Sequence, residues 1–171
     1  MKSTKSLPSV PSLVLGGRDI IEISAPEIEE LKRTAAKAEL KRARICLHPD
    51  HEDDIQEMII AFCKGTYLRP HRHQNKSESF HVMEGKLAVV FFDDNGTVVR
   101  RLILEAGKPS ASFIYRLNRP LWHTVIILSE TALIHETTNG PFVREEREFA
   151  PWSIPETDPD AAARFISDLM K

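Results

Sequence analysis

The sequence predicts a mainly β protein: a small antiparallel jelly-roll barrel, preceded by one helix and followed by a short one. From Ile55 onward, short apolar runs rich in β-branched and aromatic residues are separated by turn signals such as Asp-Asn-Gly and Asn-Gly-Pro. About eight such runs fit into ~85 residues without long loops, which is typical of a closed or sandwiched barrel. The 171 residues are 42% hydrophobic and 28% charged, so the chain can bury one core, and no linker or repeat divides it.

A helix is expected first, over residues 24–43. Ser24 and Glu27 have the spacing of a capping box, and Pro26 lies in the first turn. Apolar residues then recur at the intervals of one helix face, at Ile28, Leu31, Ala35 and Ala38. Residues 1–44 are therefore expected to form an N-terminal extension that ends in this helix.

The barrel itself is expected over residues 45–156. Its clearest hairpin is FFDDNGTVVRRLIL, in which Asn95 and Gly96 tolerate the positive φ that a tight turn requires. The same alternation of apolar runs and turn residues marks the other strands. The expected strands are residues 55–63, 66–73, 78–84, 87–93, 97–104, 112–117, 123–128 and 131–137.

A second helix is expected over residues 157–171, TDPDAAARFISDLMK, with Thr157 or Asp158 as its cap. We expect it to pack on the outside of the barrel. The extension, the barrel and this helix are expected to form one structural domain.

The charge balance argues against two classes of partner. The chain has 25 acidic and 23 basic residues, so it lacks the basic excess with which proteins bind nucleic acid or an anionic membrane surface. No apolar stretch approaches transmembrane length. Cys46 and Cys63 lie far apart in apolar runs, which indicates reduced thiols in a cytoplasmic protein. A single disulfide between them is the alternative.

Four side chains are candidates for one metal site. His71 and His73 lie two residues apart on an expected strand, so both point to the same side. Glu78 begins the next strand after a polar turn and can lie opposite this pair. His123, at the head of a later strand, offers a third nitrogen. Three imidazoles and one carboxylate suit Mn, Fe, Ni, Zn or Cu better than Ca or Mg, and leave coordination positions open.

The other four histidines are expected not to bind metal. His81 has the opposite parity to Glu78 on its strand, and three more show no ligand spacing: His48, His51 and His135. Of these, His135 is the one that an inward orientation would turn into a candidate.

The same strand parity selects residues that would meet a ligand. Arg69 and Tyr67 are expected to share the side of His71, and a buried guanidinium needs an anionic partner. Arg69 therefore either pairs with an internal carboxylate such as Glu136 or receives a phosphate or carboxylate of the ligand, with Tyr67 as a flat wall. Lys76, in the turn between the ligand strands, can contribute at the mouth. Glu136 is the candidate general base.

The stretch that begins at Gly65 resembles a known motif. Its spacing, G-x5-H-x-H-x4-E-x6-G, is that of the first motif of the cupin superfamily, in which the two histidines and the glutamate bind metal inside a small β-barrel. The second cupin motif is half present: Pro120 and His123 are there, but the proline is displaced and no asparagine follows.

At closer range the chain resembles the WbuC family of cupin-fold metalloproteins. The resemblance covers residues 45–156 and is carried by GTYLRPHRH, FHVMEGKLAVVFFDDNG, LWHTVI, HETTNGPF and EFAPWSIPE. It implies one divalent transition metal (Fe, Mn, Ni or Zn) and a homodimer. Because some WbuC relatives belong to gene clusters for surface polysaccharide, it also implies a small anionic ligand, sugar-like or a carboxylate, in sugar-nucleotide metabolism.

Three functions are compatible with these residues. The first is a metal-dependent enzyme of the isomerase, epimerase or oxygenase type. The second is a non-catalytic metal-containing module that binds or senses a small ligand. The third is a structural metal in a small barrel, which would leave a buried arginine and tyrosine beside the ligands unexplained.

Overall fold

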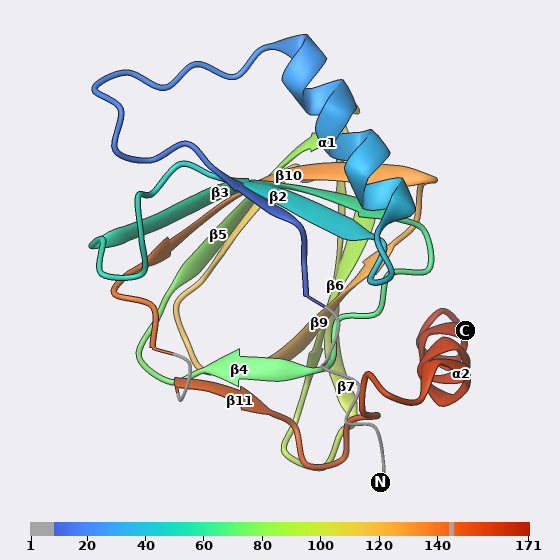
Figure 1. Ribbon diagram of the computed structural model, residues 1–171. Helices are drawn as coiled ribbons and strands as arrows, with labels where there is room; N and C mark the ends of the chain where they lie inside the picture. The colour runs from blue at the N-terminus through green and yellow to red at the C-terminus, as the bar shows by residue number, and fades with distance from the viewer. Residues whose placement is uncertain (1–8, 144–145) are drawn as a thin grey trace, which may run out of the picture.

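Two β-sheets face each other at the centre of the molecule, as the computed structural model of the chain shows (Figure 1). The structure describes residues 9–143 and 146–171. Its elements, in chain order, are β1 Ser12–Val14, α1 Ala25–Lys37, β2 Arg42–Cys46, β3 Ile55–Cys63, β4 His71–His73, β5 Glu78–Glu84, β6 Lys86–Phe92, β7 Val98–Glu105, β8 Ile114–Leu117, β9 Trp122–Ile127, β10 Thr131–Asn139, β11 Arg147–Phe149 and α2 Pro159–Leu169. The predicted mainly β class with two flanking helices is confirmed.

The two sheets are almost entirely antiparallel. One has the strand order β1-β2-β3-β10-β5-β8, in which only β1 and β2 pair in parallel, and the other has the order β11-β4-β9-β6-β7. Strands that are neighbours in a sheet are often distant in the chain, such as β10 beside β3 and β5, which is compatible with a jelly roll.

The main core lies between the sheets. The side chains that face it come from alternate positions of strands in both sheets, and include Phe80 and Val82 of β5, Val89 and Phe91 of β6, and Ile134 of β10. Each of these is almost fully buried. The space between the sheets is thus apolar over most of its length, and any polar group inside it needs a partner.

Helix α1 covers the outer face of the first sheet. The Glu27 carboxylate accepts a hydrogen bond from the Ser24 backbone N–H at 2.7 Å, as the capping-box spacing predicted. The helix buries Leu31 and Ala35 against strands β2 and β3. It ends at Lys37, however, and not at residue 43.

The predicted helix was too long because residues 42–46 form strand β2. Lys41 has a positive φ of 53°, which no helix residue can adopt, and it separates the two elements. The segment RARIC then alternates between half-buried and buried residues, with Ala43 and Ile45 under the helix. This period of two was hidden because the helical pattern leads directly into it.

All eight predicted strand ranges contain a strand, but residues 66–73 form one only at His71–His73. The Thr66 hydroxyl donates to the carbonyl oxygens of Lys41 and Cys63, which holds a turn after β3. Pro70 then offers no N–H for a strand ladder. The short strands β1 and β11 were not predicted.

Helix α2 lies on the outer face of the second sheet, as expected (Figure 1). Its N-cap is Asp158, whose carboxylate accepts a hydrogen bond from the Ala161 N–H at 3.0 Å. Phe165 and Leu169 pack there against Phe92 of β6. Within the described residues, no helix is long and apolar enough to cross a membrane.

The two glycines that bound the metal-binding motif have a conformational reason to be glycine. Gly65 and Gly85 both lie in the left-handed region, with φ of 81° and 79°. At Gly85 a Cβ atom would also lie 2.3 Å from the Thr131 carbonyl oxygen and 2.6 Å from the Ser129 Oγ. The turn between β5 and β6 therefore excludes a side chain for two separate reasons.

We expect Gly85→Ala to lower the free energy of unfolding by about 4 kcal/mol, of which about half comes from the positive φ and the rest from the clash. Gly107→Ala is the matched control, because Gly107 has a φ of 69° but nothing within 4 Å of its Cβ position. It is expected to lose only about 1–2 kcal/mol. Urea denaturation of both variants measures the difference, and equal losses would contradict the steric explanation.

Candidate metal centre

The structure brings the four predicted ligands together between the sheets. His71 and His73 come from β4, His123 from β9 and Glu78 from β5 in the opposite sheet. The imidazole centroid of His71 lies 5.1 Å from that of His73 and 4.6 Å from that of His123. The Glu78 carboxylate lies 3.0 Å from the Nε2 atom of His123 and 3.8 Å from that of His73.

Strand pairing explains why these side chains meet. His71 is directly opposite His123 in the β4–β9 pair, and His123 is directly opposite Phe91 in the β9–β6 pair. Residues directly opposite each other project from the same face of a sheet. Since Phe91 belongs to the core between the sheets, the histidines face that core as well. His123 and Glu78 are almost fully buried, whereas His71 and His73 are half-buried.

Two of the imidazoles are oriented by the backbone just before their strands. The Nδ1 atom of His71 is 2.9 Å from the Arg69 carbonyl oxygen, and that of His123 is 2.9 Å from the Leu121 carbonyl oxygen. A carbonyl oxygen only accepts hydrogen bonds, so each Nδ1 carries the proton and each Nε2 is left as the ligand atom. This is the tautomer that a metal ion requires in this cluster.

The Nε2 atom of His123 is buried and has no hydrogen-bond partner among the described residues. Glu78 Oε1 is only 3.0 Å away, but the contact lacks the geometry of a hydrogen bond. Two atoms that each lie about 2.1 Å from one metal ion, at a right angle, are about 3 Å apart. The His123–Glu78 separation thus fits two ligands of a common ion, and a metal would satisfy the orphaned nitrogen.

In residues 9–143 and 146–171, no three or more His, Cys, Asp or Glu side chains already have the arrangement of a complete metal site. His123 and Glu78 have the separation of neighbouring ligands, whereas His73 and Glu78 are farther apart. Binding a metal therefore requires rotation of the half-buried histidines toward the buried pair.

The protonation states of the cluster suit a cation. Burial, together with the charges of the other two histidines, lowers the pKa of His71 well below its usual value, and burial also lowers the pKa of His73. Burial acts to raise the pKa of Glu78, but His123 and a hydrogen bond from Tyr115 bring it down to about 2. At neutral pH, two neutral imidazoles thus face a carboxylate.

His123 behaves differently from the other two. Burial acts to lower its pKa, but the adjacent Glu78 carboxylate more than offsets this, so the pKa of His123 is raised. A proton on its Nε2 atom and a metal ion would occupy the same place next to Glu78. Metal binding at this site is therefore expected to displace that proton.

Tyr115 of β8 is a site residue that sequence analysis missed. Its hydroxyl donates a hydrogen bond to Glu78 Oε1 at 2.8 Å, and burial and the Glu78 charge raise its pKa well above 10. The hydroxyl stays protonated and holds the carboxylate in place. A signal was available, because Tyr115 and Leu117 have the same parity on their strand, and a tyrosine that faces a core needs an acceptor.

Glu136 of β10 also faces the space between the sheets. It is directly opposite Phe80, a residue of the main core. Burial and the charge of Glu78 raise the pKa of Glu136 to about 8. The residue that we predicted to be a base is therefore a neutral carboxylic acid at pH 7 while no metal ion is bound.

Arg69 and Tyr67 lie toward the C-terminal segment. The Arg69 Nε donates to Ser153 Oγ at 2.7 Å, and its guanidinium lies 4.5 Å from the centre of the Phe149 ring. The Tyr67 hydroxyl donates to the Ile154 carbonyl oxygen at 2.7 Å. Because residues 66–70 are not a strand, the side-to-side alternation does not extend from the histidines to these residues.

Pairing with an internal carboxylate and contact with a ligand were the two alternatives for Arg69, and the contacts in the described part of the chain bear on the first. Arg69 forms no ion pair with Glu136 there, and Tyr67 forms no hydrogen bond with the histidine cluster. Lys76, by contrast, lies close to the cluster but is occupied by protein partners. Its ammonium group donates to the carbonyl oxygens of Asn139 and Pro141 and lies 3.9 Å from the Glu146 carboxylate.

The four histidines expected not to be ligands lie outside the cluster. His135 Nε2 is 2.8 Å from Glu57 Oε1, and His135 is directly opposite His81 on the outer face of the first sheet. It does not point inward. His48 Nδ1 bonds to the Glu57 backbone, and His51 packs against a phenylalanine ring.

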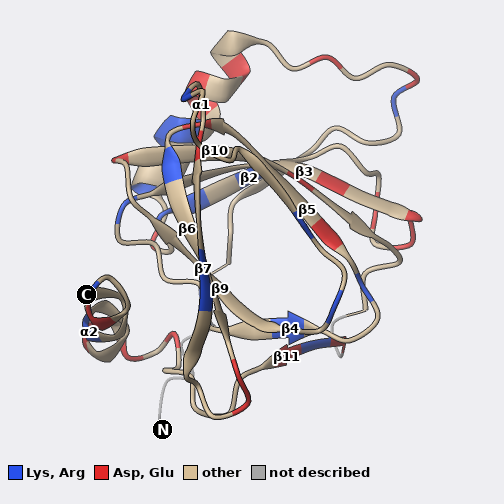
Figure 2. Ribbon diagram, turned by 180° about the vertical axis from the view of Figure 1, so that it is seen from behind, with Lys and Arg blue, Asp and Glu red and all other residues tan. Residues whose placement is uncertain are grey.

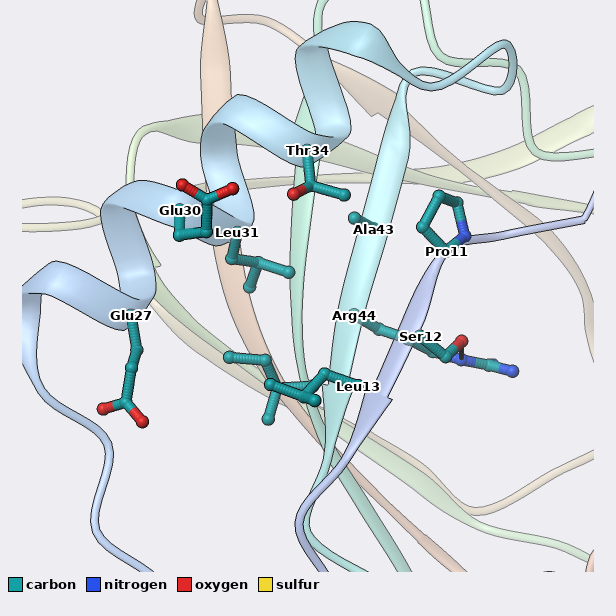
Figure 3. A pocket seen from close by; sticks show the side chains of 10 residues that line it. Pro11, Ser12, Leu13, Glu27, Glu30, Leu31, Thr34, Ala43 and Arg44 are labelled. Carbon is teal, nitrogen blue, oxygen red and sulfur yellow. Dashed lines mark hydrogen bonds between the residues drawn. The ribbon is translucent and has the colours of Figure 1, made fainter.

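A separate hollow of about 240 Å³ lies between α1, β1 and β2, on the opposite side of the first sheet (Figure 3). Leu31 and Leu13 line it, and its charged side chains already have partners. Glu27 caps the helix, Glu30 bonds to Arg33, and Arg44 bonds to Ser12. Because its charged groups are already paired with one another or with the helix end, this hollow is a weaker candidate site than the histidine cluster.

Comparison with known proteins shows which fold the chain shares with solved structures. Residues 23–104 match the model of a domain family of unknown function, DUF6016. No curated protein matches the chain. Among solved structures, the capsular polysaccharide assembling protein CapF from Staphylococcus aureus is similar with a TM-score of 0.52 and 17% identity, over 62% of this chain and 31% of that one.

Oxalate oxidase in complex with the substrate analogue glycolate is similar with a TM-score of 0.51 and 18% identity, over 78% of this chain and 73% of that one. The chain thus spans about a third of CapF and most of oxalate oxidase. At such identities the likeness concerns the fold, which is that of the cupins. The predicted cupin fold is confirmed.

Proposed function

We propose that this protein is a metal-binding cupin of the WbuC type that holds one divalent transition metal ion and binds a small anionic, sugar-like or carboxylate ligand at it. The observation that carries the proposal is the buried Nε2 atom of His123, which has no hydrogen-bond partner among the described residues and lies beside Glu78. His71 and His73 complete the ligand set. Fe, Mn, Ni and Zn all suit three nitrogens and one carboxylate oxygen.

The metal would supply a Lewis acid that polarises a hydroxyl or carbonyl group of the ligand. The protein side chains have distinct tasks. His71 and His123 are held by backbone carbonyl oxygens, and Tyr115 holds the Glu78 carboxylate. In the metal-free protein, burial and the charge of Glu78 raise the pKa of Glu136 to about 8, and a bound cation would favour its ionised form, which is the form that acts as a general base.

A proton-transfer role for Glu136 favours an isomerase or epimerase among the enzyme classes. The ligand class follows from the WbuC resemblance, and two fold neighbours are compatible with it: CapF assembles capsular polysaccharide, and oxalate oxidase binds glycolate. Fold alone does not determine substrate. A homodimer in the cytoplasm is part of the same proposal.

A non-catalytic binding or sensing module is the second candidate. It is favoured by the contacts of Tyr67 and Lys76, which are both used by the protein and not directed at a reacting group. In this second candidate function the ligand binds at the metal, and Glu136 only offsets part of the positive charge of the metal ion between the sheets.

One experiment tests both candidates. The metal-loaded protein is mixed with nucleotide sugars and with small hydroxy and dicarboxylic acids, while thermal stability and product formation are followed. We expect a stabilising ligand whose effect disappears when the metal is removed, and turnover that Glu136→Gln abolishes without loss of binding. Stabilisation without turnover would favour the binding module, and no metal-dependent stabilisation would contradict the proposal.

A further inference from the structure

Strand β11, which was not predicted, places two side chains beside the histidines. In the β11–β4 pair, Arg147 is directly opposite His73 and Phe149 is directly opposite His71. Residues directly opposite each other in an antiparallel pair project from the same face. Arg147 and Phe149 therefore lie on the face of the second sheet that carries the proposed metal ligands.

Phe149 ends a row of side chains that crosses the whole site. The register connects Phe149, His71, His123 and Phe91 on four neighbouring strands. Phe91 is buried, with 4% of its surface exposed, whereas Phe149 is 38% exposed. The row thus runs from the core to solvent, and a ligand that approaches His71 from solvent meets Phe149.

Two guanidinium groups surround this ring. The guanidinium of Arg147 lies 5.0 Å from the centre of the Phe149 ring, and that of Arg69 lies 4.5 Å from it. Arg69 is half-buried and fixed by Ser153, whereas Arg147 is exposed. Figure 2 shows strands β4 and β11 side by side at this end of the molecule.

Positive charge reaches the histidines themselves. Arg147 is directly opposite His73 in the β11–β4 pair, so its positive charge lies beside this histidine. Two guanidinium groups beside one exposed ring place positive charge there, and this charge would attract an anion bound between the ring and the metal. An arginine is also the residue that binds phosphate and carboxylate with two parallel hydrogen bonds.

The geometry points to Arg147 as the residue that binds the anionic group of the ligand, with Phe149 as the wall on which the ligand's apolar or sugar face rests. This inference builds on the proposed function, because it concerns the ligand of the same metal site. The ligand would then carry a phosphate or carboxylate group next to a flat, weakly polar part such as a sugar ring. The guanidinium of Arg69 packs against the Phe149 ring, and in this proposal it does not contact the ligand.

The test uses metal-loaded protein and two simple anions, inorganic phosphate and malonate, with affinities measured by calorimetry. We expect Arg147→Gln to weaken binding of the preferred anion by about tenfold or more, since a hydrogen bond to a charged group is lost. The anion affinity of Arg147→Lys should lie between those of the native protein and Arg147→Gln, because lysine keeps the charge but cannot form two parallel hydrogen bonds. Tighter binding of phosphate would identify a phosphorylated ligand, and tighter binding of malonate a carboxylic acid.

Arg101→Gln is the matched control. Arg101 is an exposed arginine of β7 directly opposite Val90, which belongs to the outer cluster under α2, so it lies on the far face of the same sheet. Its loss should change anion affinity less than about twofold. Metal content, measured on each variant, separates the two proposals. If the native protein is found to contain no metal, the proposed function is wrong. Equal anion affinity of native protein and Arg147→Gln at full metal content, or no anion binding by the native protein at millimolar concentration, would overturn only the role of Arg147.

Discussion

Replacing both His71 and His73 by alanine is expected to abolish metal binding, from about one ion per chain to almost none. The double variant retains only His123 and Glu78, and two ligands do not hold a divalent ion against buffer and cellular chelators. Protein purified without added metal is measured by elemental analysis. Because both side chains are half-buried, their removal is expected to leave the fold intact, which circular dichroism checks.

The control for this experiment removes two histidines that share the same chemistry but face outward. His81 and His135 are directly opposite each other on the outer face of the first sheet, so His81→Ala with His135→Ala should retain full metal content. Full occupancy in the His71 and His73 double variant would show that the metal, if any, is held elsewhere.

The second large effect concerns Glu136 in metal-free protein. The pKa of Glu136 is about 8 in the folded state, against 4.5 for an ordinary glutamate, so the folded state holds this proton more tightly than the unfolded state. Its contribution to stability is therefore complete below pH 4.5 and is lost as the pH rises to 8. We expect the native protein to lose about 2–3 kcal/mol across this range relative to Glu136→Gln, after allowance for solvent screening.

Urea denaturation of both proteins at several pH values measures this difference. Other groups titrate in the same range, but they are common to both proteins, so the difference between the two curves isolates Glu136. With a metal ion bound, the cation would favour the ionised carboxylate, and the difference should shrink. Parallel curves for the metal-free proteins would mean that Glu136 is ionised like any exposed carboxylate.

The sequence could predict that His71, His73, Glu78 and His123 lie close together because most of the signals for this are local. His71 and His73 need only the period of a strand, and the short polar connection of residues 74–77 places Glu78 at the start of the next strand. The pairing of distant strands is different. Nothing in one sequence says that Tyr115 donates to Glu78 or that Arg147 lies opposite His73, because those contacts depend on strand registers that only the fold determines.

The errors have equally specific causes. The alternation that correctly related His71 to His73 was extended across Pro70 to Arg69, although a residue that lacks an N–H interrupts the strand there. At the end of α1, the helical pattern concealed a strand of five residues after Lys41. In both cases a single backbone position changed the period of the chain.

The proposed ligands are divided unequally between the two sheets, and this has a consequence for the choice of metal. Three nitrogens belong to one sheet, and two of these imidazoles are oriented by carbonyl oxygens two residues earlier in the chain, whereas the single oxygen ligand, Glu78, comes from the other sheet. The ionic radius that the site accepts is therefore governed by the spacing between the sheets. Core residues such as Phe91 and Val125, which never touch the ion, would then determine which metal the protein selects.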